Sequence, residues 1–239
     1  MPPHSTSFTP LNIDQESVPE WMGSFAISAP PNSDLWRKPP SRDTSTAPVL
    51  YTALRNPFVC AEVTVSADWE LEWDQGGLVI FAGAPPGRIT SGQTTASDAA
   101  QGNAPPAYAP PPPVSKWVKV GLEFCNNACH ATSVCATSDG ADWAMTALPA
   151  YHSRRCDLRV KIERIGYGLW VWYQDDLTGW RKLREVTWFF WGVEDKAVRV
   201  GVYASRPVNL GPTVYQQRNG GPSTTQRNLV VQFEGLEIF

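Results

Sequence analysis

Residues 117–124 read Trp117-Val118-Lys119-Val120-Gly121-Leu122-Glu123-Phe124, in which apolar residues alternate with aromatic, charged and small ones. Because successive side chains of a β-strand point to opposite faces, the stretch predicts a strand with two different faces. One face belongs to a core and carries Val118, Val120, Leu122 and Phe124. The other carries Trp117, Lys119, Glu123 and Gly121, which leaves room for a ligand to approach. The alternative is the ordinary exposed face of a sandwich.

Lys119 and Glu123 lie about 13 Å apart along such a strand, too far to pair with each other. We expect each of them to pair with a neighbouring strand or with a ligand. Two later stretches repeat the pattern, and their polar faces carry Arg159, Lys161 and Glu163 and then Arg199, Gly201 and Tyr203. If these strands are adjacent, their polar faces form one groove lined by charged and aromatic side chains.

Strand signals dominate the rest of the chain. Further strands are expected at 57–66, 76–82, 132–137, 158–165, 169–173, 198–204 and 229–238. No segment has a long helical period, and at most a turn or two of helix is expected near 16–22 or 188–194. Many short strands separated by Gly, Pro and Asn predict an all-β fold, a sandwich or jelly roll of two antiparallel sheets.

Composition narrows the class of protein. The 239 residues suit one large domain, and a net charge of −3 argues against a nucleic-acid partner or an anionic membrane surface. No apolar stretch approaches the roughly 18 residues of a membrane span. The N-terminus lacks the features of a secretory signal, so we expect a cytoplasmic protein whose five cysteines are free thiols.

Three cysteines lie close together at Cys125, Cys129 and Cys135, beside His130. Their spacing is not a common zinc pattern, and we expect a hairpin with buried thiols instead. We expect no metal and no organic cofactor.

The domain is expected to cover residues 24–239, with residues 1–23 as an N-terminal extension that packs on it. Residues 84–115 are rich in Pro, Ala, Gly and Ser, and are interpreted as an insertion, either solvent-exposed or a lid.

The segment Trp69 to Gly77 is dense in acidic residues. If it is extended, Glu70, Glu72 and Asp74 share one face, where carboxylates can bind Ca²⁺ or act as an acid/base pair. The alternative is a solvated hairpin edge.

Eleven tryptophans are the other unusual feature. Trp170 and Trp172 alternate with apolar residues, so they share one face of a strand. A face lined by tryptophan is a usual way to hold a sugar, although any single Trp is more often a core residue.

Several stretches together resemble the DUF1349 family, which includes a yeast protein described as a regulator of enolase. These are 33–37, 73–78, 117–123, 133–137 followed by Asp142-Trp143, 158–160 and 200–207. The chain departs from the family at Trp73, Gly77 and Ala141, and its proline-rich insertion and thiols are typical of a fungal member.

The resemblance implies a concanavalin A-like jelly roll. That fold hosts lectins, hydrolases, lyases and isomerases, so it does not decide the function. The family's recurrent motif residues map onto Asp34, Trp36, Asp74, Gln75, Lys119, Glu123, Asp142 and Trp143, and we expect them to gather at the concave side.

Three hypotheses follow. The first is a binding protein for a glycan or similar small metabolite, held in the concave groove by Trp36, Asp74, Gln75, Trp117, Asp142, Trp143, Trp170, Trp172 and Tyr203. The second is a cofactor-independent isomerase, lyase or cyclase with Glu123 as general acid or base and Lys119 stabilising a developing anion. The third, which rests on the resemblance alone, is a regulatory partner of a metabolic enzyme. A homodimer through an edge strand stays open.

Overall fold

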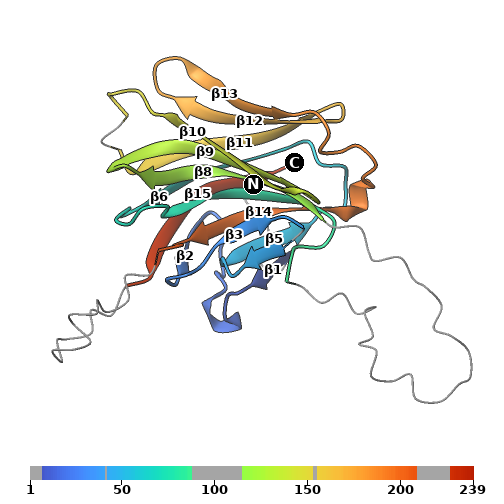
Figure 1. The fold of residues 1–239 in the computed structure, drawn as a ribbon, viewed down its shortest axis with the longest axis horizontal. Helices are drawn as coiled ribbons and strands as arrows, with labels where there is room; N and C mark the ends of the chain where they lie inside the picture. Colours follow the sequence, from blue (N-terminus) through green and yellow to red (C-terminus); the bar gives the residue numbers. More distant parts are fainter. Residues whose placement is uncertain (1–6, 41, 88–114, 153–154, 209–226) are drawn as a thin grey trace, which may run out of the picture.

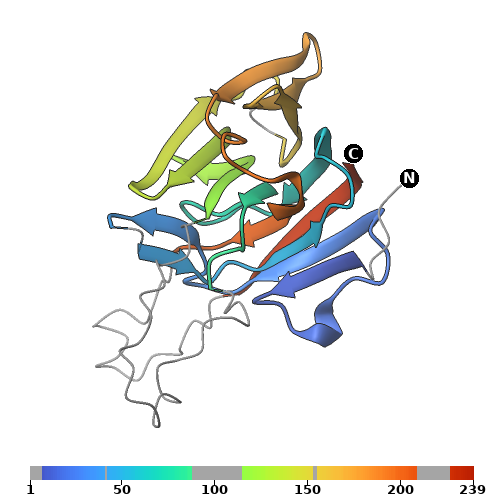
Figure 2. The same ribbon diagram turned by 90° about the vertical axis from the view of Figure 1, so that its right-hand side faces the viewer.

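A computed structural model describes residues 7–40, 42–87, 115–152, 155–208 and 227–239, which form a sandwich of two antiparallel sheets (Figures 1 and 2). The first sheet has seven strands in the order β1 (Phe8–Leu11), β5 (Val49–Ala53), β14 (Val198–Ser205), β7 (Gln75–Ala82), β8 (Lys116–Cys125), β9 (Ala128–Thr137) and β10 (Gly140–Ala147). The second has six strands in the order β13 (Gly179–Val186), β12 (Gly168–Asp175), β11 (Asp157–Ile165), β6 (Cys60–Ala67), β15 (Leu229–Ile238) and β2 (Ser24–Ala29). The predicted jelly-roll sandwich is confirmed.

Outside the two sheets, β3 (Leu35–Lys38) and β4 (Arg42–Ser45) form a separate hairpin. Within the described ranges, the helical structure consists of two short 3₁₀ turns, Gln15–Ser17 and Asp195–Ala197. No described helix is long and apolar enough to cross a membrane. Of the expected insertion, residues 88–114 lie outside the described residues.

The main core lies between the two sheets and takes one face of each long strand. Val118, Val120 and Leu122 of β8 are fully buried there, and Phe124 packs against them. Val160 and Ile162 of β11 contribute from the opposite sheet. The alternation of residues 117–124 therefore predicted the correct face.

Strands β8 and β9 form the expected hairpin. Asn126 and Asn127 make its two-residue turn, and both have positive φ angles (53° and 58°), a backbone that asparagine adopts more easily than most residues. Cys125 and Cys129 flank the turn and are buried, and all five cysteines are free. Among the described residues, no group of three His, Cys, Asp or Glu side chains is placed to hold a metal.

A second apolar cluster covers the outer face of the seven-stranded sheet, the face that is turned away from the other sheet. Tyr51, Phe81 and Trp117 from three strands are buried beneath Leu35 and Ala47, which lie in and beside the β3–β4 hairpin. Only part of this outer face remains uncovered, and the candidate site lies there.

Close approach of two strands explains the glycine on the outer face of β8. Gly121 pairs with Gly77 of β7, and a Cβ atom on Gly121 would lie 1.9 Å from the carbonyl oxygen of Gly76. The expectation that Gly121 makes room for a ligand is therefore corrected, because it is the neighbouring strand that needs the space.

Candidate functional site

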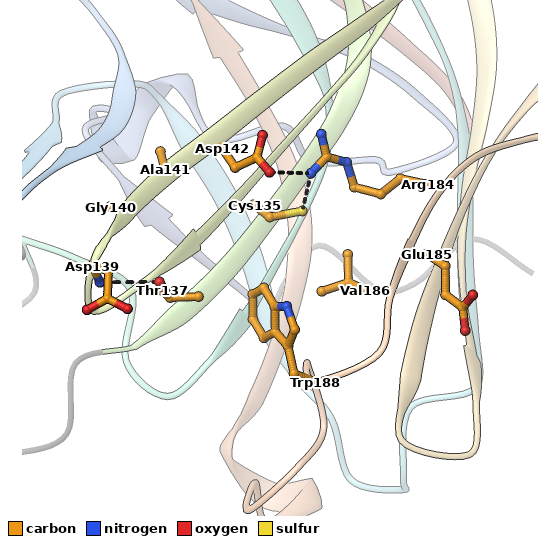
Figure 3. Close-up of a pocket in the computed structure, with 10 residues that line it drawn as sticks. All are labelled: Cys135, Thr137, Asp139, Gly140, Ala141, Asp142, Arg184, Glu185, Val186 and Trp188. Carbon is orange, nitrogen blue, oxygen red and sulfur yellow. Dashed lines mark hydrogen bonds and ion pairs between the residues drawn. The ribbon is translucent and has the colours of Figure 1, made fainter.

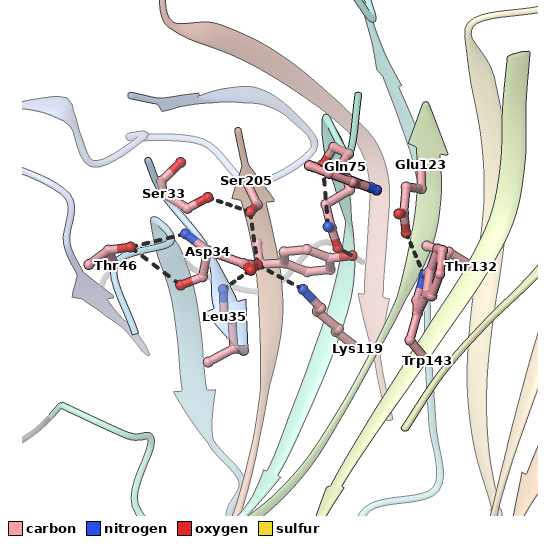
Figure 4. A network of polar contacts seen from close by, with 12 residues as sticks. Ser33, Asp34, Leu35, Thr46, Gln75, Lys119, Glu123, Thr132, Trp143 and Ser205 are labelled. Atoms are coloured by element: carbon pink, nitrogen blue, oxygen red, sulfur yellow. Dashed lines mark hydrogen bonds and ion pairs between the residues drawn. The ribbon is translucent and has the colours of Figure 1, made fainter. Parts of the chain in front are cut away.

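A cavity of about 420 Å³ opens on the uncovered part of this outer face. Its exposed edge carries Trp73 and Trp143, and Trp36 of β3 lines one wall. Its floor is polar and consists of Gln75, Lys119 and Glu123, with Asp34 beside them (Figure 4). Polar groups at the bottom and aromatic rings around them are the usual composition of a small-molecule site.

Lys119 is the buried cation of the floor, with only 1% of its surface exposed. Its Nζ atom donates to Asp34 Oδ1 at 3.2 Å and lies 5.3 Å from the centre of the Tyr203 ring. Asp34 Oδ1 also accepts from the Leu35 backbone N–H at 2.7 Å. Lys119 therefore pairs with a neighbouring segment, as expected, and this hydrogen bond to Asp34 leaves the other N–H groups of its ammonium for a ligand.

Glu123 is the buried acid of the floor and is 2% exposed. Trp143 Nε1 donates to its Oε2 atom at 3.0 Å and to Thr132 Oγ1 at 3.2 Å (Figure 4). Burial raises the pKa of the Glu123 carboxyl, while the hydrogen bonds from Thr132 and Trp143 and the charge of Lys119 act in the opposite direction. The site thus holds a carboxyl group that binds a proton more readily than one in water.

Gln75 connects the floor to the rim. Its Oε1 atom accepts from the Tyr203 hydroxyl at 3.2 Å, and its Nε2 atom donates to the Trp73 carbonyl at 3.3 Å. Trp73 itself has φ of +67°, an unusual backbone for a bulky residue. The Trp73 N–H donates to the Phe124 carbonyl at 2.8 Å, which holds the indole at the mouth.

The structure brings five of the expected site residues to this cavity: Trp36, Gln75, Lys119, Glu123 and Trp143. Tyr203 lies directly beneath them and orients Gln75 and Lys119. Trp117 is on the expected face, but it is buried in the second apolar cluster and does not line the cavity.

Asp74 has a structural role in place of the expected ligand contact. It is fully buried and accepts from Arg206, Nε to Oδ1 at 2.9 Å and Nη2 to Oδ2 at 2.6 Å. The segment before it is a turn and not a strand, so Glu70 and Glu72 do not share a face with it. The condition for the shared acidic face, an extended segment, is therefore not met; Glu70 and Asp74 both contact Arg206, whose Nη2 atom lies 3.5 and 2.6 Å from their carboxylates.

Trp170 and Trp172 do not belong to the cavity either. They stack at 5.9 Å on the outer face of β12, in the other sheet, between Lys161 and Lys182. Strand β11 lies beside β12, so its polar face is also separate from that of β8. The single groove expected from these strands is corrected to two different surfaces.

Asp142 lies on the opposite side of β10 from Trp143, because consecutive residues of a strand alternate. Its carboxylate is 3.4 Å from Arg184 Nη1 in a second cavity of about 480 Å³ (Figure 3). Arg184 also donates to Ser133 Oγ and Cys135 Sγ, at 3.0 and 3.5 Å. Arg184, the cation of this larger cavity, is already bound by Asp142, Ser133 and Cys135. We therefore favour the first cavity as the candidate functional site.

Sequence reasoning did not assign a site role to Trp73 or Thr132. In the sequence Trp73 stands out only as a departure from the family. Its place directly before Asp74-Gln75 was nevertheless a signal that this aromatic side chain lies beside Gln75. Thr132 is opposite Gly121 in the hairpin register, so its position beside Glu123 follows once β8 and β9 are paired.

Comparisons with known proteins agree on a family whose function is not described. The family "Protein of unknown function (DUF1349)" matches residues 12–237. A protein of Emericella nidulans described as uncharacterized is 32% identical over 202 residues, which are 82% of this chain and 85% of that protein.

Solved structures share the fold. The structure of a functionally unknown protein from Saccharomyces cerevisiae has a TM-score of 0.61 at 18% identity, covering 98% of this chain and 96% of that one. The GH43 BlXynB protein from Bacillus licheniformis has a TM-score of 0.56 at 10% identity. That match covers 92% of this chain but only 33% of the hydrolase, and at this identity it concerns the fold alone.

Proposed function

The chain belongs to the DUF1349 family, and we propose that it binds a carbohydrate or a similar small metabolite in the cavity on the outer face of the seven-stranded sheet. One observation carries the proposal. Exposed indoles of Trp73 and Trp143 surround buried groups that can both donate and accept hydrogen bonds. A sugar has apolar C–H faces and a rim of hydroxyl groups, so it matches this combination.

The polar floor supports a polyhydroxylated ligand in particular. Lys119 offers N–H donors, and Glu123 and Gln75 offer further polar atoms within the same cavity. Asp34 Oδ1 accepts from the Leu35 N–H and from Lys119 Nζ, which leaves Oδ2 to accept from a ligand hydroxyl. Neighbouring hydroxyls could therefore be bound by a cation and a carboxylate at once.

The test is a titration of intrinsic tryptophan fluorescence, and of binding heat, with a panel of monosaccharides, oligosaccharides and small metabolites. Trp73→Ala is expected to weaken the binding of any hit by about fivefold or more, because a stacked ring contributes roughly 1–3 kcal/mol. Trp191→Ala is the matched control, since Trp191 is also exposed but packs on Tyr167 outside the cavity. A panel without any hit, or equal losses in both variants, would count against the proposal.

A second candidate is a cofactor-independent isomerase, lyase or cyclase that uses the same cavity. It is favoured by the burial of Glu123 and its raised pKa, which suit a general acid or base, and by Lys119 nearby. Hydrolysis of glycosides is less well supported, because Asp74 and Asp142 lie away from the cavity and the remaining carboxylate of the floor, Asp34, is paired with Lys119. Recovery of a hit compound unchanged after long incubation would argue for the binding protein, and full turnover by Glu123→Gln would exclude this role for Glu123.

The free thiols of all five cysteines also support our proposal of a cytoplasmic location, where thiols stay reduced.

A further inference from the structure

The outer face of a seven-stranded sheet is wide enough for a cleft that crosses several strands, but here most of it is covered. Toward one edge, the outer faces of β14 and β5 are occupied by Tyr203 and Tyr51, which are buried. Leu35 and Ala47 belong to the same apolar cluster, and the Ser33–Asp34 segment is fixed above β14. Ser33 N–H donates to the Arg206 carbonyl, and Ser205 Oγ donates to the Ser33 carbonyl at 2.7 Å.

The β3–β4 hairpin closes a second direction, along the strands. Beyond Lys119, the next outward residue of β8 is Trp117, which is buried beside Phe81. Arg37 fastens the hairpin to the sheet, because its Nη1 atom donates to the carbonyls of Ser115 and Thr137 at 2.7 and 3.0 Å. Its Nε and Nη2 atoms donate to both carboxylate oxygens of Asp43, so the anchor is rigid.

The exposed lining residues Trp143 and Trp73 lie on the two sides of the cavity that neither the covered strands nor the hairpin closes. Trp143 is on β10, the edge strand of the sheet, and Trp73 is in the turn before β7. Within the described part of the chain, the floor groups thus lie at the closed end of a recess and not in the middle of a through-going cleft. An internal unit of a polysaccharide has neighbours on two opposite sides. Across the strands and along them, the described residues close one of the two ends of the recess, so neither direction has room for a neighbour on both sides.

We infer that the cavity binds its ligand end-on, taking the terminal one or two units of a saccharide or a free small saccharide, and that it excludes internal segments of a polymer. This inference rests on the proposed function and adds the size class of the ligand. A volume of about 420 Å³ lies toward the small end of the range for small-molecule sites, which agrees with a ligand of one or two rings.

The experiment compares chain lengths. Linear xylo-, cello- and malto-oligosaccharides from monomer to hexamer are titrated at equal molar concentration, together with xylan, soluble cellulose derivatives, amylose and β-cyclodextrin, which has no chain end. End-on binding predicts that the molar affinity of the active series changes by no more than about twofold beyond the dimer. The parent polymer should bind only in proportion to its chain ends, and β-cyclodextrin should not bind if the malto series does.

Three results would overturn the inference, and they differ from one another. An affinity that rises about tenfold or more from dimer to hexamer, or binding of the endless β-cyclodextrin, would show a through-going cleft and leave the proposed function intact. No binding of any saccharide would overturn the inference together with the carbohydrate form of the proposed function. Trp143→Ala and Trp191→Ala locate the binding: loss in the first variant alone assigns it to this cavity, and loss in neither places it elsewhere and overturns the inference.

Discussion

At the scale of single residues, Glu123 is a buried carboxyl group on the cavity floor, with 2% of its surface exposed. Burial raises its pKa, so the folded protein binds a proton at Glu123 more readily than the unfolded chain does. The contribution of Glu123 to stability is therefore fully present at low pH and decreases as the pH rises from the unfolded-state pKa through the higher folded-state pKa.

Glu123→Gln removes this titration, and its neutral amide oxygen can still accept from Trp143. We expect the difference in unfolding free energy, variant minus wild type, to become more favourable to the variant as the pH rises above about 4, the unfolded-state pKa of a glutamate. Urea unfolding at a series of pH values measures it. Glu185→Gln, at an exposed position of β13, is the matched control for replacing a carboxylate by an amide. A difference for Glu123→Gln that changes with pH no more than the difference for Glu185→Gln would contradict the raised pKa of Glu123.

At the scale of elements, the β3–β4 hairpin depends on Arg37 for its position over the sheet. Arg37→Met leaves the Ser115 and Thr137 carbonyls without this donor and Asp43 without its partner. We expect a loss of about 1–3 kcal/mol in unfolding free energy, because removal of a donor leaves carbonyl groups without a hydrogen bond. Faster hydrogen exchange over residues 35–45 should accompany it, together with loss of ligand binding.

The control for this prediction is Lys196→Met, which breaks the Lys196–Glu194 ion pair at the surface and should not measurably change stability. If Arg37→Met unfolds at the same urea concentration as the wild type and exchanges no faster over 35–45, the anchoring role is wrong.

Strands were predictable where they were long and had one buried face. The boundaries expected for the last strand, 229–238, agree with β15, and the alternation in β8, β11 and β14 identified their core faces correctly. The missed strands include β3 and β4, with four residues each, and β10, whose residues are mostly exposed. A four-residue strand is too short to show a period, and an exposed strand has no apolar face to reveal one.

At the scale of the whole molecule, the sequence predicted which face of a strand is buried, but it did not predict to which of the two sheets the strand belongs. Strands β8 and β12 alternate equally well, and only the pairing of distant segments puts Lys119 and Trp172 on opposite sides of the sandwich. The same limit explains Asp74, whose partner Arg206 is 132 residues away. The family resemblance supplied the jelly roll and several cavity residues, because motif residues from distant segments meet there.

The N-terminal strand belongs to the sheet that carries the cavity, although it lies far from the cavity itself. Strand β1 pairs with β5, and Phe8 is buried in the main core. A chain that begins at Asn12 loses β1 but keeps the Asn12 side-chain bonds to the Ser45 and Ala47 carbonyls.

We expect this truncation to lower the unfolding free energy by about 3 kcal/mol or more, because it removes a buried phenylalanine and uncovers the β5 edge. A chain that begins at Ser7 retains β1 and is the reference for this comparison, in urea and in calorimetry. Saccharide affinity, measured well below the melting temperature, should be the same for both truncations, since the Ser33–Asp34 segment lies between β5 and the cavity. Equal stability of the two truncations would show that β1 does not contribute to the sheet, and a loss of affinity in the shorter chain alone would show that the cavity depends on that edge.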